Sequence, residues 1–98
     1  MKQALSNDSW IWVVISDPGS SEEILGQIDP EENLKYIPSF YEKEAALMCV
    51  NLLSKERGMK YEIQAIIVED LLNYSSENGF MVFILNSEGE VEERLPLG

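Results

Sequence analysis

The side chains in this sequence that are best suited to chemistry are carboxylates between residues 17 and 32. They are Asp17, Glu22, Glu23, Asp29, Glu31 and Glu32. Paired carboxylates can transfer protons, and groups of them can hold hard cations such as Mg²⁺ or Ca²⁺. A calcium loop needs ligands at alternating positions closed by a glycine and a glutamate, and this spacing does not match. We therefore expect a solvated acidic rim and predict no metal site, with a divalent-cation binder as the alternative.

Residues 16–23, SDPGSSEE, form the loop best placed for a ligand, because they are expected to leave a buried strand and enter a helix. The candidate ligand residues are Asp17, Gly19, Ser20, Ser21 and Glu22. The free N–H groups of a helix start could hold an anion there. However, the loop has one glycine and no lysine or arginine, so it matches no nucleotide-binding motif. A Pro-Gly turn also explains these residues, and we predict no cofactor.

The residue types used most often in catalysis are missing or unsuitable. Histidine is absent, which removes the usual general base near neutral pH and excludes Ser-His-Asp and Cys-His sites. Cys49 is the only cysteine, so it can form neither an internal disulfide nor a structural zinc site. We expect it in a helix among apolar side chains, where a thiol packs rather than reacts. The sequence therefore predicts no catalytic residues and no enzyme activity.

The net charge narrows the class of partner. Eighteen acidic residues against seven basic ones give a formal charge of -11. This negative field repels phosphate backbones and anionic lipid headgroups, so we expect neither a nucleic-acid nor a membrane partner. A basic protein, peptide or cation is favoured, although a high net charge also serves solubility alone.

The length and hydropathy of the chain indicate one domain over residues 1–98. A chain of 98 residues with 45% hydrophobic residues can form one core without metal or disulfide. The first ten residues, MKQALSNDSW, lack the apolar segment of a signal peptide, and the longest apolar run, WIWVVI, is too short to span a membrane. We expect a cytoplasmic protein in which residues 1–8 are flexible.

The first part of the chain predicts a strand, a short helix and a turn. Residues 10–15 are aromatic and β-branched, which is typical of a strand buried on both faces, with both tryptophans in the core. A capping box from Ser20 to Glu23 predicts a short helix over residues 20–28. Gly26 interrupts this helix, and EILGQI can also be interpreted as a strand.

The next part predicts the main helix. A turn at residues 29–33 leads to a short extended segment, LKYIP, which its proline would confine to a sheet edge or strand end. Ser39 and Glu42 form a second capping box, and Gly58 suits a C-cap, so the helix is expected over residues 40–57.

One side of this helix is apolar and the other polar. At 100° per residue, the core-facing stripe consists of Ala45, Met48, Cys49, Leu52 and Leu53. Leu47 and Val50 flank the stripe and form the candidate interaction surface, for another protein or for a second copy in a homodimer.

The rest of the chain completes a mixed sheet. Residues 61–68 alternate like a strand with one wet face, and VEDLLNYSSENG predicts a helix ended by Asn-Gly. Residues 80–95 predict a hairpin with a turn at residues 86–89 and a charged edge strand. The expected fold class is α+β: a two-layer sandwich with a mixed sheet of four to five strands and two to three helices mainly on one face.

Three segments, YIPSFYEKEAA, IQAIIVEDLL and FMVFILNSEGEV, carry a resemblance to a known family. In order and spacing, residues 34–91 resemble the N-terminal domain of SseB-like bacterial proteins. Tyr41 stands where that family usually has Thr or Ser, and NSEG replaces an Asn-Pro turn. The resemblance implies a bacterial protein-interaction or regulatory module, with no catalytic residues to carry over.

Two functional hypotheses follow from these observations. The first is a small non-enzymatic module that binds another protein, motivated by the acidic charge and the missing catalytic residue types. The alternative is a small-molecule or divalent-cation binder, or a carboxylate-based enzyme, that uses the loop at 16–23 and the acidic rim.

Overall fold

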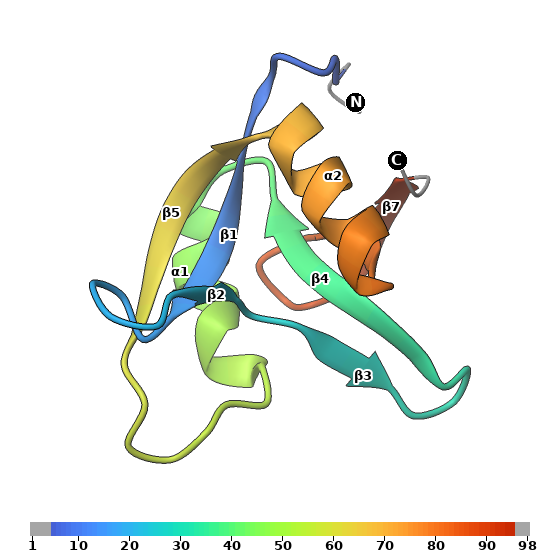
Figure 1. Cartoon of the computed structure of the whole chain (residues 1–98). Helices are drawn as coiled ribbons and strands as arrows, with labels where there is room; N and C mark the ends of the chain where they lie inside the picture. The colour runs from blue at the N-terminus through green and yellow to red at the C-terminus, as the bar shows by residue number, and fades with distance from the viewer. Residues whose placement is uncertain (1–4, 96–98) are drawn as a thin grey trace.

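A computed structural model describes residues 5–95 and shows a mixed sheet with an α-helix on each face (Figure 1). The elements in chain order are β1 (Trp10–Ser16), β2 (Glu23–Ile24), β3 (Gln27–Asp29), β4 (Leu34–Phe40), α1 (Lys43–Cys49), the 3-10 turn η1 (Val50–Leu52), β5 (Tyr61–Ile67), α2 (Val68–Asn78), β6 (Met81–Leu85) and β7 (Val91–Leu95). The predicted α+β class and mixed sheet are confirmed. The sheet has seven strands rather than four to five because β2 and β3 lie where a helix was expected.

The sheet is organised around β1 and β4. β5 pairs antiparallel with β1 along its whole length. β1 also pairs with β4, through Trp12 and Val13, and with β2, through Ile15 and Ser16. β4 pairs in parallel with β6, and β6 pairs antiparallel with β7. The sheet order therefore places β5 and β7 at its two edges.

β1 and β4 pair over two residues and then diverge, and residues 23–29 lie between them (Figure 1). We call residues 23–29 the bridging segment. Its first part pairs with β1, where the Leu25 N–H donates to the Val14 carbonyl at 2.8 Å, and its second part, β3, pairs with β4. The helix predicted at 20–28 is therefore wrong, and the alternative extended interpretation is confirmed. The diverging strands offer backbone partners that outweigh a weak local helix preference.

β4 is an interior strand, contrary to the edge position expected for LKYIP. It pairs with β6 on one side and with β3 and then β1 on the other. Pairing with β3 ends at Tyr36 and pairing with β1 begins at Ser39, so Pro38 lies where β4 changes its antiparallel partner. A missing N–H is tolerated best in such an interval.

The two helices cover opposite faces of the sheet. On the α2 face, the buried side chains of the strands are Ile11, Val13, Ile15, Ile37, Val82, Ile84 and Leu95. On the α1 face they are Val14, Phe40, Phe83 and Leu85. These sets alternate along β1 and β6, as the period of a strand requires. The expected arrangement with helices mainly on one face is therefore wrong, because both faces of the central strands are apolar.

The main helix is shorter than predicted at both ends. Ser39 and Phe40 continue β4, so the side chain of Ser39 is buried and does not cap the helix. Glu42 takes the N-cap position without a side-chain hydrogen bond. The helix ends in η1 at Leu52, and Gly58 has its expected positive φ of 83° but lies in the following loop. Pairing of β4 with β1 and β6 overrides the local capping signal.

Helix α2 has the end that the sequence predicts. Gly79 follows Asn78 in the left-handed conformation, with φ 74° and ψ 28°. At the other end, the Val68 and Glu69 N–H groups donate to the carbonyls of Ser9 and Asn7, both at 2.9 Å. Of the segment expected to be flexible, residues 1–4 lie outside the described part, and residues 6–9 form a turn tied to α2. Within residues 5–95, neither helix is long and apolar enough to cross a membrane.

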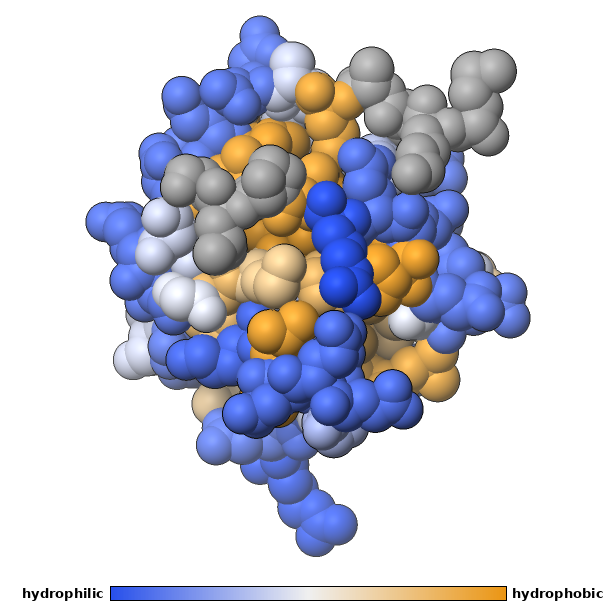
Figure 2. All heavy atoms as spheres, turned by 90° about the vertical axis from the view of Figure 1, so that its right-hand side faces the viewer, coloured by the Kyte–Doolittle hydropathy of each residue, from blue (hydrophilic) through white to orange (hydrophobic). Residues whose placement is uncertain are grey.

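The remaining predictions concern the hairpin and the tryptophans. The hairpin of β6 and β7 is confirmed, and Gly89 in its turn has a φ of 85°. Trp10 is 62% exposed, so its expected place in the core is wrong; it starts β1 beyond the cover of either helix cluster. Trp12 is partly buried beneath the Lys43 ammonium, 5.6 Å from its ring centroid. Figure 2 shows the side with β3, β4 and β7, which is largely hydrophilic with hydrophobic groups emerging between charged ones.

Candidate functional site

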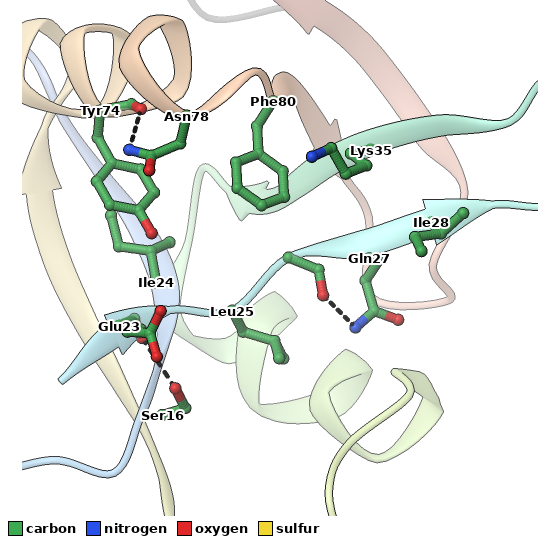
Figure 3. A pocket seen from close by; sticks show the side chains of 11 residues that line it. Ser16, Glu23, Ile24, Leu25, Gln27, Ile28, Lys35, Tyr74, Asn78 and Phe80 are labelled. Atoms are coloured by element: carbon green, nitrogen blue, oxygen red, sulfur yellow. Dashed lines mark hydrogen bonds between the residues drawn. The ribbon is translucent and has the colours of Figure 1, made fainter. Parts of the chain in front are cut away.

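A pocket of about 520 Å³ lies over the bridging segment on the α2 face (Figure 3). This volume is within the usual range for small-ligand sites. Its lining comes from Ser16 of β1, all of residues 23–28, Lys35 of β4, Tyr74 and Asn78 of α2, and Phe80. The pocket lies where β1 and β4 diverge and the bridging segment pairs first with one and then with the other.

An aromatic wall stands over the middle of the bridging segment. The rings of Phe80 and Tyr74 are stacked with centroids 6.4 Å apart. The Lys35 ammonium lies 5.4 Å from the centroid of Phe80. A Cβ added to Gly26 would come within 2.9 Å of Phe80 Cζ, closer than real side chains allow. The Phe80 ring therefore rests directly on the backbone of Gly26, which only a glycine permits.

The polar groups of the pocket differ in how much of their hydrogen-bonding capacity is already used within the protein. The Gln27 amide makes three hydrogen bonds, since it donates to the carbonyls of Gly26 and Ser54 and accepts from the Ser54 N–H at 2.8 Å. The Asn78 amide donates to the Tyr74 carbonyl at 2.9 Å, which leaves its oxygen able to accept a hydrogen bond. Among residues 5–95, Lys35 forms no ion pair.

The Tyr74 hydroxyl is held in its neutral form. Burial raises its pKa first, the nearby Glu23 carboxylate raises it further, and a hydrogen bond from the Ile24 backbone lowers it. The net shift is upward, so this hydroxyl is a neutral donor and not an ionised group.

The predicted ligand loop is largely occupied with its own backbone. The Gly19 N–H donates to the Glu22 carboxylate at 2.7 Å, and the Ser21 N–H donates to the Asp17 carboxylate at 3.2 Å. Asp17 takes a positive φ of 53° and accepts at its carbonyl from the Ser20 N–H. Asp17, Gly19, Ser20, Ser21 and Glu22 do not line the pocket, whereas the residues that flank them, Ser16 and Glu23, do.

The acidic rim is spread out in the structure. The Asp29 carboxylate accepts from the N–H groups of Glu31 and Glu32, and the Glu32 carboxylate pairs with Arg94 at 3.3 Å. In the part of the chain that the structure describes, no three acidic or cysteine side chains are arranged to hold a metal ion. The Asp29 carboxylate therefore stabilises a local turn, and the Glu32 carboxylate contacts β7.

The candidate interaction surface on α1 is larger than predicted and differs in membership. Leu47 is 51% exposed, whereas Val50 is partly buried against the α1-face core. Met48 and Leu52, expected in the core, are 65% and 64% exposed. We call Leu47, Met48 and Leu52 the α1 shoulder. The expected stripe is confirmed for Cys49, Ala45 and Leu53, which lie in or against the α1-face core, and wrong for Met48 and Leu52, because Ala46 faces the sheet instead.

Cys49 is buried, as predicted. Burial raises the pKa of its thiol, so less thiolate forms near neutral pH than for an exposed cysteine. The turn after β6 lies over it, since a Cβ on Gly89 would be 3.7 Å from Cys49 Sγ and 3.9 Å from Leu52 Cδ1.

Sequence reasoning missed most of the pocket. Lys35, Tyr74, Asn78 and Phe80 come from elements that only the fold brings together. The available signal was Gly26, since an isolated glycine in an apolar extended stretch often marks a close approach of other groups.

Comparison of the chain with protein-family models, curated proteins and solved structures finds no match. The resemblance to SseB-like proteins therefore stays a prediction.

Proposed function

We propose that this chain is a non-enzymatic cytoplasmic module that binds a basic, amphipathic segment of another protein through the α1 shoulder. The observation that carries the proposal is the exposure of three large aliphatic side chains, Leu47, Met48 and Leu52, on one short helical segment. Leu52 is four residues after Met48, so the two side chains lie about one turn apart. Grouped apolar side chains of this kind are typical of docking surfaces.

Acidic residues at both ends of the shoulder support a basic partner. Glu42 and Glu44 are exposed at the start of α1. Glu88 and Glu90 are exposed in the turn whose Gly89 lies against Leu52. An apolar segment flanked by lysine or arginine would complement this surface in both hydrophobicity and charge.

The same charges favour an external partner over a homodimer. Two copies that paired through their shoulders would bring acidic residues together in a chain of net charge -11. Like charges placed across an interface oppose association, more strongly at low salt. A second copy of the chain is therefore the less favoured occupant.

The test uses a defined probe, an 18-residue amphipathic helix made of leucine and lysine, titrated by calorimetry. We expect salt-dependent binding to the native chain and at least a tenfold loss in the double variant Met48→Glu, Leu52→Glu. The matched control is Val91→Glu, which adds a charge at an exposed apolar residue of β7 and should bind within twofold of the native chain.

Two results would contradict the proposal. Equal binding by the native chain and the double variant would show that the probe recognises overall charge and not the shoulder. A salt-independent dimer in light scattering, dispersed by Met48→Glu, would assign the shoulder to self-association.

A further inference from the structure

We propose that the pocket over the bridging segment binds an extended peptide of five residues. The first, third and fifth side chains of this peptide are basic, apolar and acidic, in this order or in the reverse order. This site lies beside α2, shares no residue with the α1 shoulder, and does not depend on the function proposed above. Three features of the pocket carry the inference: its charged ends, its apolar middle and its length.

The two ends of the pocket carry opposite charges. Glu23 lies at one end and Lys35 at the other, with Phe80 between them (Figure 3). Both side chains are exposed, and in residues 5–95 neither forms an ion pair. A ligand that fits must therefore present a cation to Glu23 and an anion to Lys35.

The middle of the pocket is apolar and flat. Phe80 lies on Gly26, and Ile24 belongs to the partly buried apolar groups around the α2-face core. The Phe80 ring covers the backbone of Gly26, so the partly buried side chains of Phe80 and Ile24 form the apolar surface that an aliphatic group of the ligand would contact. The free oxygen of the Asn78 amide can accept an N–H from the ligand backbone.

The length of the pocket fits a strand of five residues. Lys35 is paired with Ile28, which is five residues after Glu23, so the ends are at most roughly 16 Å apart along the bridging segment. In an extended peptide, residues i and i+4 lie about 13 Å apart, and residues i, i+2 and i+4 share one face. The long charged side chains at the two ends of the peptide can span the remaining distance to Glu23 and Lys35.

The experiment titrates three end-blocked peptides into isotopically labelled protein and follows the backbone amide signals. The peptides are Lys-Ser-Leu-Ser-Glu, its reverse Glu-Ser-Leu-Ser-Lys, and the neutral Gln-Ser-Leu-Ser-Gln. We expect one charged peptide to shift the amides of Gly26, Gln27 and Phe80 saturably, with an affinity at least fivefold above the neutral peptide. Which of the two orders binds then gives the chain direction.

Variants separate this site from general charge effects. Lys35→Gln should weaken the charged peptide about fivefold, the size of one exposed ion pair. Lys35→Glu should make Lys-Ser-Leu-Ser-Lys the tighter ligand. The matched control is Lys55→Gln, because Lys55 also lies near an aromatic ring, at 6.0 Å from that of Tyr61, but outside the pocket.

The proposal is overturned if both charged peptides bind no better than the neutral one, or if Lys55→Gln weakens binding as much as Lys35→Gln. The double variant Met48→Glu, Leu52→Glu should leave peptide affinity unchanged. If that variant lost the peptide as well, the signal would belong to the α1 shoulder and not to the pocket.

Discussion

Helices α1 and α2 cover the same sheet from opposite sides, but they bury side chains of different size in the core. Helix α2 has 11 residues and buries Val68 and Leu71 against aliphatic side chains of the strands. Helix α1 has seven residues and buries Ala46 and Cys49. On the α1 face the bulk comes from the sheet, through Phe40 and Phe83.

This difference explains why the first helical segment exposes large apolar side chains and α2 does not. Small side chains on the inner side of α1 let its backbone lie close to the aromatic rings of the sheet. The large side chains of the α1 shoulder consequently point outward, where they add little to folding. On α2, by contrast, large side chains are needed in the core.

The sharpest test of this comparison is to remove one large side chain from each helix. Leu71→Ala should lower the free energy of unfolding by about 3 kcal/mol, since Leu71 is fully buried. Met48→Ala should change it by no more than about 0.5 kcal/mol, because Met48 is 65% exposed. Urea unfolding followed by tryptophan fluorescence measures both. Similar losses in the two variants would mean that α1 also supplies bulk to the core.

The opposite change tests how closely α1 packs. Ala46→Leu should destabilise the fold by about 2 kcal/mol, since Ala46 is fully buried between α1 and the sheet and extra methylenes force the helix away. Ala45→Leu is the matched control, because Ala45 is partly buried on the same helix. Thermal unfolding of both variants gives the comparison, and a stabilised Ala46→Leu would reveal unfilled space under α1.

A third test compares the glycine that ends α2 with the one expected to end α1. Gly79→Ala should cost about 1 kcal/mol, because φ 74° is unfavourable for a residue with a Cβ and the helix end fixes it. Gly58 has a similar φ of 83° but lies in the loop after η1, which can relax, so Gly58→Ala should cost less. The free energy of unfolding of both variants is measured by urea unfolding. Equal losses would mean that the backbone is equally constrained at Gly79 and at Gly58.

The parts of the fold that could be predicted have local signals. The apolar run of β1, the Asn78-Gly79 end of α2 and the turn at Asn86–Gly89 each depend on residues that are neighbours in the chain. The ends of the main helix and the region of Gly26 were predicted wrongly. At the start of the helix and around Gly26, the outcome depends on where β1 and β4 pair and separate, which no local pattern encodes.

The candidate sites show the same difference between features that have a local sequence signal and features that depend on the fold. Leu47 was found because its exposure follows from the phase of a helix, while Met48 and Leu52 were misplaced because α1 turned its small residues inward. The pocket combines residues of four strands, β1 to β4, with the end of α2, so it could not be predicted without the fold. Gly26 indicated that another group lies close to the backbone there, but it did not indicate that this group is Phe80.

The smallest expected effect concerns Tyr41, which precedes α1 in the chain but packs with the α2-face core. Its hydroxyl donates to the Glu93 carboxylate of β7. Burial raises the pKa of Tyr41 to about 12, with the hydrogen bond to Glu93 and the charges of Glu93 and Glu92 adding to the shift.

Because this pKa is above the value of 10.0 for an unperturbed tyrosine, folding favours the neutral hydroxyl. The stability that it contributes should be fully present below pH 10 and be lost as the pH rises from 10 towards 12. Urea unfolding at pH 8, 10 and 11 measures this loss, and Tyr41→Phe should remove the part due to Tyr41 while leaving the contributions of the other tyrosines. An unchanged pH dependence in Tyr41→Phe would show that the bond to Glu93 does not hold β7 to the rest of the sheet. In that case β7 would be held by its backbone pairing with β6 and by the packing of Leu95.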